Sequence, residues 1–317
     1  MRIFYVVSGD HVAGGQLVNL AHVTTLRTWG HDARLLIVRP PAEGDAPFQP
    51  AFPEGSEPPP WQRGAQGLAA DDVVVVGEMF GQGALEVQDS PARKVIHNQN
   101  PFYIFEAFAD APSMRRWGAS HMICASRFTA DMALQAGWTG PTSVVRPGID
   151  PIFHGDPDQP RTLAVAYMPR KRRMDARLIR GLLRSRRPDL TAIPWIELTN
   201  ASRQDCARAL KSAAVFLSLS YNEGLGLPPV EAMAGGALVV GFHGGGGREY
   251  ATAENGDWFD DGKPVEVADA LAAALDALVA GERFAGRRAA GVRTAQAFSQ
   301  AAFETDLKAA WATILGA

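Results

Sequence analysis

The feature of this sequence that most constrains its fold is the alternation of short apolar runs with stretches of helical periodicity. The run Ile3–Val7 lies between polar and turn-forming residues, as a buried strand does. Leu17, Leu20 and Ala21 then follow the i, i+3, i+4 spacing of one helix face. Consecutive parallel strands need crossover helices, so a repeated strand–helix unit predicts a doubly wound α/β sheet.

The alternation stops once, near the middle of the chain, and then resumes. Arg146–Pro151 breaks the pattern, and a new apolar run begins at Thr162. A chain of 317 residues also has about twice the length of an ordinary domain. We therefore expect α/β domains over residues 1–152 and 153–298, and an amphipathic helix within 299–317. The other expected strands are Ala33–Val38, Val73–Val76, Lys94–His97, Met122–Ala125, Ser143–Val145, Leu163–Tyr167, Pro194–Leu198, Val215–Leu219 and Ala237–Val240. The other expected helices are Arg127–Gln135, Met174–Leu183, Arg203–Lys211, Pro229–Ala234, Val265–Val279 and Gln300–Leu315.

Composition excludes several classes of protein. With 46% apolar residues the chain can bury a core, and a net charge of −3 gives it no basic excess for nucleic acid. The apolar run at its start is too short for a secretory signal, and no run is long enough to span a membrane. Cys124 and Cys206 lie too far apart for a metal-binding spacing. We expect a cytoplasmic protein without a metal site, for which peripheral membrane contact stays open.

The stretch from Pro40 to Pro60 is rich in proline and has no periodicity, which predicts an extended surface loop. Two interpretations remain open. The segment is either a solvent-exposed insertion or a rim over the ligand-binding face of the first domain.

The most informative segment is Ser220–Gly236, which follows an apolar strand and opens a helix. Backbone N–H groups at such a junction form an anion site, and Gly224 and Gly226 allow a ligand to approach the backbone closely. A diphosphate suits that site. Glu223 and Glu231 flank it, the first in the loop and the second in the first helical turn, where each can accept hydrogen bonds from sugar hydroxyls.

This segment resembles the characteristic motif of glycosyltransferase family 4, in which two glutamates enclose seven residues with a glycine-rich loop between them. The resemblance implies the GT-B fold: two facing Rossmann-like domains with parallel sheets and a deep cleft, and a last helix that packs back on the first domain. It also implies a retaining transferase that uses a nucleoside-diphosphate sugar and needs no metal or other cofactor. Under it, Glu223 would hold the transferred sugar and Glu231 the nucleotide ribose. The phosphate would be bound at Gly224, Leu225, Gly226 and Leu227.

A basic segment, Met168–Arg173, follows the first strand of the second half, at the edge where open α/β sheets bind ligands. Members of the family place an Arg and a Lys here to neutralise the diphosphate, a few residues apart and followed by Gly. This chain has them adjacent and lacks that Gly. We expect Arg170 and Lys171 to face the phosphates because they stand nearest the strand end, with Arg173 in reserve. For the rest of the run, a solvated helix face and an anionic membrane surface are both open: Arg177, Arg180, Arg184, Arg186 and Arg187.

Two features of the first half also match the family. Ser8–Gly15 joins the first strand to the first helix without the G-x-G-x-x-G spacing of a dinucleotide site. The resemblance implies that Gly14 and Gly15 face the donor phosphates and the acceptor. A tight structural turn is the alternative, and the two interpretations are compatible. His97 ends an apolar strand at the same sheet edge. The family implies a contact with the transferred sugar there, and a purely structural histidine is the alternative.

The sequence leaves the base, the sugar, the acceptor and the oligomeric state open. The acceptor is a glycan, a lipid-linked molecule or a small molecule. Two other classes of function remain: a sugar-nucleotide epimerase of the same fold, which would act on the donor alone, and a non-catalytic protein that binds nucleotide sugars or nucleic acid. Steep salt dependence of binding would identify the nucleic-acid case.

Overall fold

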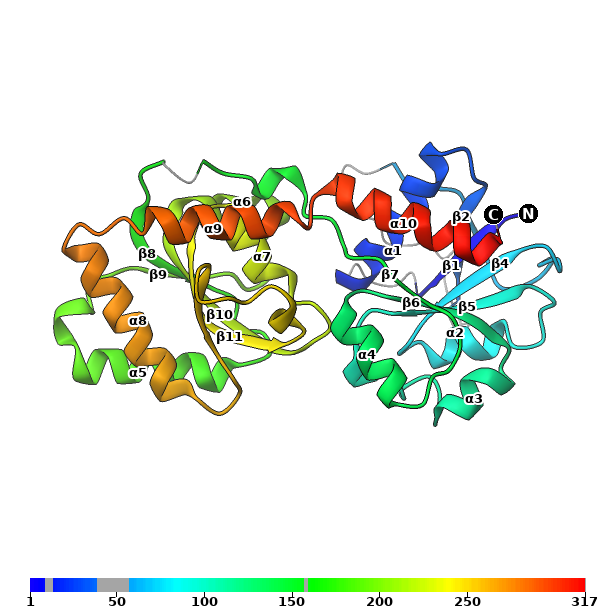
Figure 1. Cartoon of the computed structure of the whole chain (residues 1–317), viewed down its shortest axis with the longest axis horizontal. Coiled ribbons are helices and arrows are strands. Elements are labelled where there is room, and N and C mark those ends of the chain that lie inside the picture. Colours follow the sequence, from blue (N-terminus) through cyan, green and yellow to red (C-terminus); the bar gives the residue numbers. More distant parts are fainter. Residues whose placement is uncertain (9–13, 39–56, 157–158, 317) are drawn as a thin grey trace, which may run out of the picture. The chain divides into compact units, whose positions relative to one another are not determined.

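The computed structural model describes residues 1–8, 14–38, 57–156 and 159–316 (Figure 1). They form two compact units, of which one comprises Met1–Arg146 with Glu304–Ala317 and the other Pro147–Phe303. These limits lie a few residues from the boundaries expected at 152 and 298. Most of the proline-rich segment, and with it the choice between an insertion and a rim, lies outside the described residues.

The first unit is built on a seven-stranded parallel sheet of order β3-β2-β1-β4-β5-β6-β7. Strands are added outward from β1 in both directions, which is the doubly wound arrangement that the strand–helix alternation predicts. The strands are β1 Ile3–Val7, β2 Ala33–Ile37, β3 Trp61–Arg63, β4 Val73–Gly77, β5 Arg93–Asn98, β6 Ala119–Cys124 and β7 Thr142–Val144. The helices are α1 Gly14–Thr28, α2 Gly81–Glu86, α3 Ala111–Arg116 and α4 Arg127–Gln135.

Central strands of this sheet are buried on both faces, which explains their continuous apolar sequence. Every residue of Val73–Val76 is at most 1% exposed. A polar side chain caps the start of α4: the Ser126 hydroxyl accepts a hydrogen bond from the Thr129 amide at 3.0 Å. The sequence pattern and the local capping therefore select the same boundary.

The second unit contains a five-stranded parallel sheet of order β12-β11-β10-β8-β9. Its strands are β8 Thr162–Tyr167, β9 Trp195–Glu197, β10 Ala213–Glu223, β11 Leu238–Gly245 and β12 Gly256–Phe259. Its helices are α5 Arg173–Arg186, α6 Arg203–Ser212, α7 Leu227–Ala234, α8 Pro264–Val279 and α9 Ala285–Gln296. Two parallel sheets flanked by helices confirm the predicted α/β class.

The last helix, α10, spans Gln300–Leu315, as the amphipathic pattern predicts. From Glu304 onward its residues belong to the first unit. Arg146 forms a 2.9 Å ion pair with Asp306, and Trp311 is 2% exposed. Within the described residues, no helix is both long and apolar enough to cross a bilayer.

Two sequence expectations near the second sheet's edge are wrong in detail. Glu223 is the last residue of β10 rather than a loop residue, because the strand resumes pairing with Gly245 after an irregularity between Ser220 and Glu223. Glu231 lies in the second turn of α7, since the helix begins at Leu227.

Candidate active site

Lys171 and Glu223 meet at the carboxyl edge of the second sheet. The Lys171 Nζ lies 2.9 Å from the Glu223 Oε1, and their side chains are 21% and 26% exposed. The ammonium also donates hydrogen bonds to the carbonyl oxygens of Tyr221 at 3.1 Å and Asn222 at 3.3 Å. A cation and a carboxylate thus stand side by side in partial contact with solvent. That pair suits a ligand whose negative charge adjoins a set of hydroxyl groups.

Neighbouring arginines have different roles from each other. Arg170 is exposed and forms no ion pair with any residue that the structure describes. Arg172 is buried, donates to the Ser220 carbonyl at 3.0 Å, pairs with Asp175 at 2.7 Å and lies over the Phe242 ring at 4.2 Å. Its guanidinium is therefore committed to holding the strand ends together. Arg170 and Lys171 are left as the cations placed to meet a ligand.

A second glycine-rich segment, Gly244–Gly247, packs against the turn between β10 and α7. Gly226 has a φ of 81°, a left-handed conformation that favours glycine, and its carbonyl accepts a 2.7 Å hydrogen bond from the Tyr250 hydroxyl. A side chain at Gly246 would place a Cβ 2.2 Å from the Gly224 carbonyl oxygen. The two segments can pack this closely only because both lack side chains.

This packing presents the amino end of α7 at the sheet edge, where the backbone N–H groups before Pro228 are available, because Pro228 and Pro229 have none. Leu225 is 4% exposed and anchors the turn in the core, whereas Leu227 is partly exposed. Any contact from Leu225 to a ligand would therefore come from its backbone. The sequence analysis missed Tyr250, whose only signal is its place four residues after Gly246.

Glu231 stands close to a pair of charged residues that the sequence analysis did not connect with it. Burial raises the pKa of Glu231 to about 7, an effect opposed by the charge of Arg203 and reinforced by that of Asp150. Arg203 and Asp150 themselves form a 3.2 Å ion pair. A carboxyl group with such a pKa changes its charge near neutral pH. Its affinity for hydroxyl donors will change with it.

In the first unit, His97 lies inside the protein and not on its surface. It is 1% exposed, and burial lowers its pKa to about 3, so the ring is neutral. Its Nδ1 donates to the Asn19 Oδ1 at 2.8 Å, which leaves Nε2 as an acceptor, and this buried Nε2 has no hydrogen-bond partner in the described structure. His97 is therefore not a structural histidine with both ring nitrogens hydrogen-bonded within the described structure. Its burial also means that the ring is not exposed to a ligand.

The two expected glycines begin the helix that His97 packs against. Gly14 and Gly15 are exposed at the start of α1. The Gln99 side chain donates to the Gly15 carbonyl and to the Asn19 Oδ1, both at 3.1 Å. A Cβ on Gly15 would lie 3.1 Å from the Gln99 Oε1. Gln99 therefore ties the end of β5 to the start of α1.

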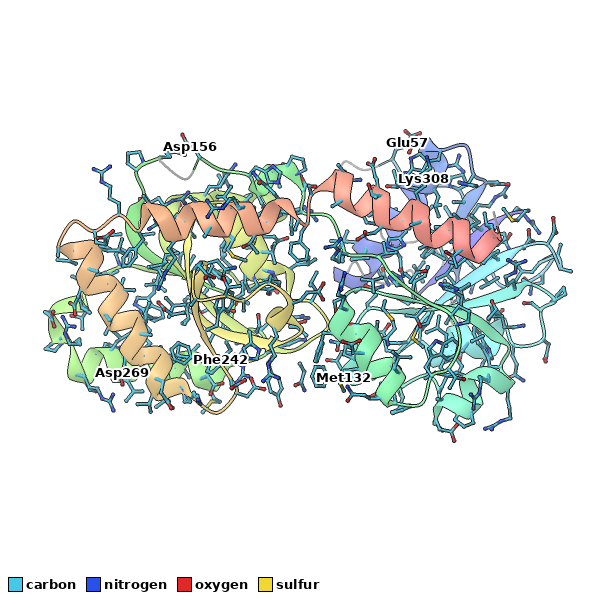
Figure 2. The ribbon with its side chains drawn as sticks, in the orientation of Figure 1. Glu57, Met132, Asp156, Phe242, Asp269 and Lys308 are labelled. Carbon is cyan, nitrogen blue, oxygen red and sulfur yellow. The ribbon has the colours of Figure 1, made fainter. Side chains whose placement is uncertain are left out.

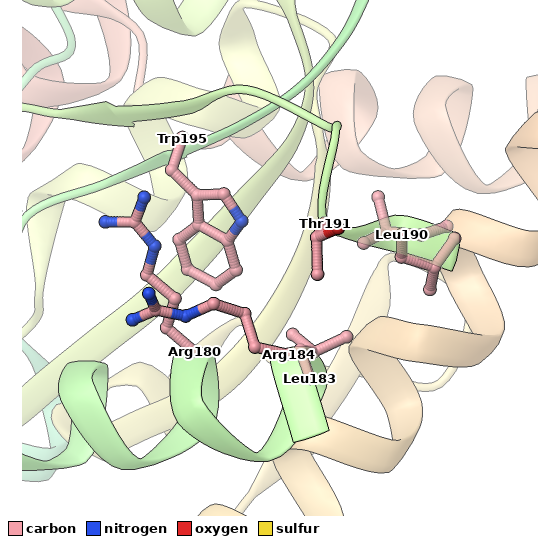
Figure 3. Close-up of a pocket in the computed structure, with 7 residues that line it drawn as sticks. Arg180, Leu183, Arg184, Leu190, Thr191 and Trp195 are labelled. Carbon is pink, nitrogen blue, oxygen red and sulfur yellow. The ribbon is translucent and has the colours of Figure 1, made fainter. Parts of the chain in front are cut away.

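A row of arginines runs along the exposed side of α5. Within the described part of the chain none of the four forms an ion pair, and the exposed Met174 and Leu178 lie beside them on the same helix. Arg180 and Arg184 line a shallow pocket with the Trp195 ring, and Arg180 lies 5.5 Å from that ring (Figure 3). The row consists of Arg173, Arg177, Arg180 and Arg184.

The last arginines of the basic run are neutralised by acidic residues. Arg186 pairs at 3.1 Å with Asp269, and Arg187 pairs with Asp189 and Asp276. Asp269 belongs to α8 and is labelled in Figure 2. Within the described residues, ion pairs therefore neutralise Arg186 and Arg187 but none of the four arginines of the row, although Arg173 and Arg180 lie close enough to Glu197 to lower its pKa.

Comparisons with known proteins bear on this geometry. Residues 196–287, which include both glutamates, match the family model described as glycosyl transferases group 1. An alpha-1,6-glucosyltransferase of Actinobacillus pleuropneumoniae is 26% identical over 288 residues, which is 89% of this chain and 86% of the relative. Anabaena HepE in complex with UDP and glucose is similar with a TM-score of 0.69 at 14% identity, over 99% of this chain and 100% of that one. A sucrose-phosphate synthase of Thermosynechococcus elongatus reaches a TM-score of 0.72 at 14% identity, over 99% of each chain.

Proposed function

We propose that this chain, a glycosyltransferase of the GT-B fold, transfers a sugar from a UDP-sugar to an acceptor hydroxyl, with glucose as the first candidate for the sugar. The observation that carries the proposal is the adjacency of Lys171 and Glu223 beside the glycine turn. UDP as the nucleotide is supported by HepE, whose structures hold UDP, UDP with glucose, and UDP-glucose. Glucose is supported further by the name of the Actinobacillus relative.

The proposed roles follow from position. Arg170, Lys171 and the amides of Gly224–Leu227 would bind the diphosphate at the amino end of α7. Glu223, which Lys171 already touches, would accept hydrogen bonds from hydroxyls of the adjoining sugar. Glu231, one helical turn further along, would accept them from the ribose. Along the chain, Glu223, the glycine turn and Glu231 follow one another in the same order as sugar, diphosphate and ribose in the donor.

Transfer would proceed with retention of the anomeric configuration. The acceptor oxygen attacks the anomeric carbon on the face from which the diphosphate departs, the bond from that carbon to the phosphate oxygen breaks, and the departing oxygen takes the acceptor proton. No protein base is needed. Support comes from the α-1,6 linkage in the relative's name, because the sugar of UDP-glucose is itself α-linked and an α-product retains that configuration.

The reaction would not require a metal ion. The charge that develops on the departing diphosphate is met by two cations and by N–H groups fixed before the reaction begins, which is the arrangement that stabilises transition-state charge most effectively. Gly14, Gly15 and His97 would serve the transferred sugar and the acceptor. For the acceptor itself, a glycan, a lipid-linked molecule and a small molecule stay as candidates.

The four-arginine row would let the enzyme work in the cytoplasm at the inner face of a membrane. Arginines beside exposed Met174 and Leu178 suit the interface of an anionic bilayer, where each basic side chain contributes about 1 kcal/mol. Sedimentation with phosphatidylglycerol vesicles should carry the protein down, and phosphatidylcholine vesicles should not. Arg177→Glu with Arg184→Glu should abolish this binding, whereas Arg116→Glu, which alters a side chain 71% exposed in the first unit, should not. Equal loss in both variants would remove the proposed surface.

The function is tested by incubating the chain with UDP-glucose, other UDP-sugars and other nucleoside-diphosphate glucoses against a panel of glycosides, lipid-linked sugars and free sugars. We expect UDP release, and an α-linked product by NMR, from UDP-glucose. A β-linked product would contradict retention. Conversion of UDP-glucose to another UDP-sugar without an acceptor would identify an epimerase instead.

A further inference from the structure

Glu78, which immediately follows β4, holds the end of the neighbouring strand through its carboxylate. The side chain belongs to a residue only 3% exposed. Its Oε2 accepts a hydrogen bond from the Gln99 amide at 3.1 Å, and its Oε1 accepts one from the Asn100 amide at 3.0 Å. The Glu78 amide donates in turn to the His97 carbonyl at 3.3 Å. One residue thus fixes three backbone groups within the four positions 97–100, at and just beyond the end of β5.

Burying the ionised Glu78 carboxylate is energetically unfavourable. Glu78 forms no ion pair with any described residue, and burial raises its pKa to about 7. Asp72, at the opposite end of the same strand, is also buried and also accepts two backbone N–H groups, from Arg2 and Ala69 at 2.8 Å each. Unlike Glu78, Asp72 has an arginine partner, Arg2, at 2.5 Å. A buried carboxylate without such compensation loses hydration that its hydrogen bonds only partly replace.

The segment that Glu78 holds carries the polar side chains of the first unit's candidate site. Gln99 reaches from it to the Gly15 carbonyl and to the Asn19 Oδ1. The same Asn19 oxygen accepts the proton of the His97 Nδ1. The carboxylate sets the amide of Gln99, and with it the direction of a side chain that joins β5, α1 and the His97 ring. Rotation of that amide would disturb all three contacts.

We infer that Glu78 is a positioning residue of the transfer reaction, whose carboxylate aligns Gln99 and, through Asn19, the His97 ring. The inference rests on the proposed function. It assigns Glu78 no contact with substrate, and it separates the residue from the nucleotide site of the second unit. Loss of the carboxylate should therefore slow turnover and leave UDP affinity unchanged.

Glu78→Gln tests this with little change in volume, because an NH₂ group replaces one acceptor oxygen and faces a backbone N–H. We expect kcat to fall at least about tenfold, since small misplacements of reactive groups have effects of that size or larger. The Kd for UDP should stay within about twofold, a change near 0.4 kcal/mol. Asp72→Asn is the matched control: it lowers the melting temperature through the same kind of lost contact but should leave kcat unchanged.

Gln99→Ala and the double variant decide whether the effect passes through Gln99. If it does, Gln99→Ala lowers kcat as well, and the double variant is little worse than the more impaired single variant, because coupled residues are not additive. The inference would be overturned if the double variant lowered kcat by the product of the two single effects. It would also be overturned if Glu78→Gln lowered kcat no more than Asp72→Asn does. Should Glu78→Gln fail to fold, unchanged kcat in Gln99→Ala overturns it alone. Turnover by the unaltered chain tests the proposed function separately, and the ratios among variants test only Glu78.

Discussion

Replacing Glu231 by glutamine should weaken UDP binding by an amount that depends on pH. Burial places the pKa of Glu231 at about 7, so at pH 6 about one tenth of the molecules carry the carboxylate and at pH 8 about nine tenths. The ionised form accepts hydrogen bonds from both ribose hydroxyls through two oxygens, whereas the protonated form has lost one of those acceptors. Affinity of the unaltered chain should therefore rise with pH through 7.

Glutamine does not titrate. The ratio of the Kd for UDP of Glu231→Gln to that of the unaltered chain therefore separates the titration of Glu231 from that of UDP itself. We expect that ratio to grow about tenfold between pH 6 and pH 8, in proportion to the ionised fraction. At pH 8 the loss should reach roughly 1.5 to 3 kcal/mol, the usual value of hydrogen bonds to a charged group. Both constants are measured by calorimetry with UDP.

Glu197→Gln is the control, because Glu197 ends β9 at the same sheet edge and its pKa is lowered by hydrogen bonds from Tyr167 and Thr199. It stays ionised throughout this pH range, so its ratio to the unaltered chain should not change with pH. A constant ratio for Glu231→Gln, or UDP binding as tight as in the unaltered chain, would refute the ribose role.

Three other outcomes follow from the site. Glu223→Gln should retain affinity for UDP while losing transfer, whereas Arg170→Ala should lose both, and equal loss of UDP affinity in the two variants would contradict the division of roles. EDTA should leave most turnover intact, and a complete loss that Mg²⁺ or Mn²⁺ restores would show that metal-free charge stabilisation is insufficient. Gly246→Ala should weaken UDP binding at least about tenfold, because its Cβ would meet the Gly224 carbonyl at 2.2 Å, and full affinity in a folded variant would exclude support of the turn by that contact.

Elements with a clear apolar pattern were predicted well from the sequence. A strand buried on both faces of a parallel sheet has a continuous apolar sequence, and a helix that packs on one side has apolar residues at helical spacing. The strand Ile3–Val7 and the helices Arg127–Gln135 and Gln300–Leu315 have the expected limits. Elements with little apolar contrast were missed. The helix Ala285–Gln296 consists mainly of alanine, glycine and arginine, and the strand Trp61–Arg63 is three residues long. Their positions are fixed by packing against elements remote in the sequence.

The candidate site was predictable where a motif is local and not where it depends on tertiary contacts. Glu223 and Glu231 stand out with the glycines between them, and Lys171 was placed beside this segment by the rule of strand ends. Nothing in the sequence pairs Lys171 with Glu223, or brings Arg203 to Glu231, because those residues are far apart along the chain. Glu78 had a weak signal, a lone carboxylate two residues after the run Val73–Val76. Its role becomes apparent only from its hydrogen bond to the Gln99 amide.

The most direct test of the central claim is a crystal structure of the chain with UDP-glucose or with UDP and glucose. The account predicts the diphosphate within hydrogen-bond distance of the Lys171 Nζ and of the amides of Gly224–Leu227, with glucose hydroxyls on the Glu223 carboxylate and the ribose on Glu231. A nucleotide bound with its phosphates away from Lys171 and the glycine turn would contradict it.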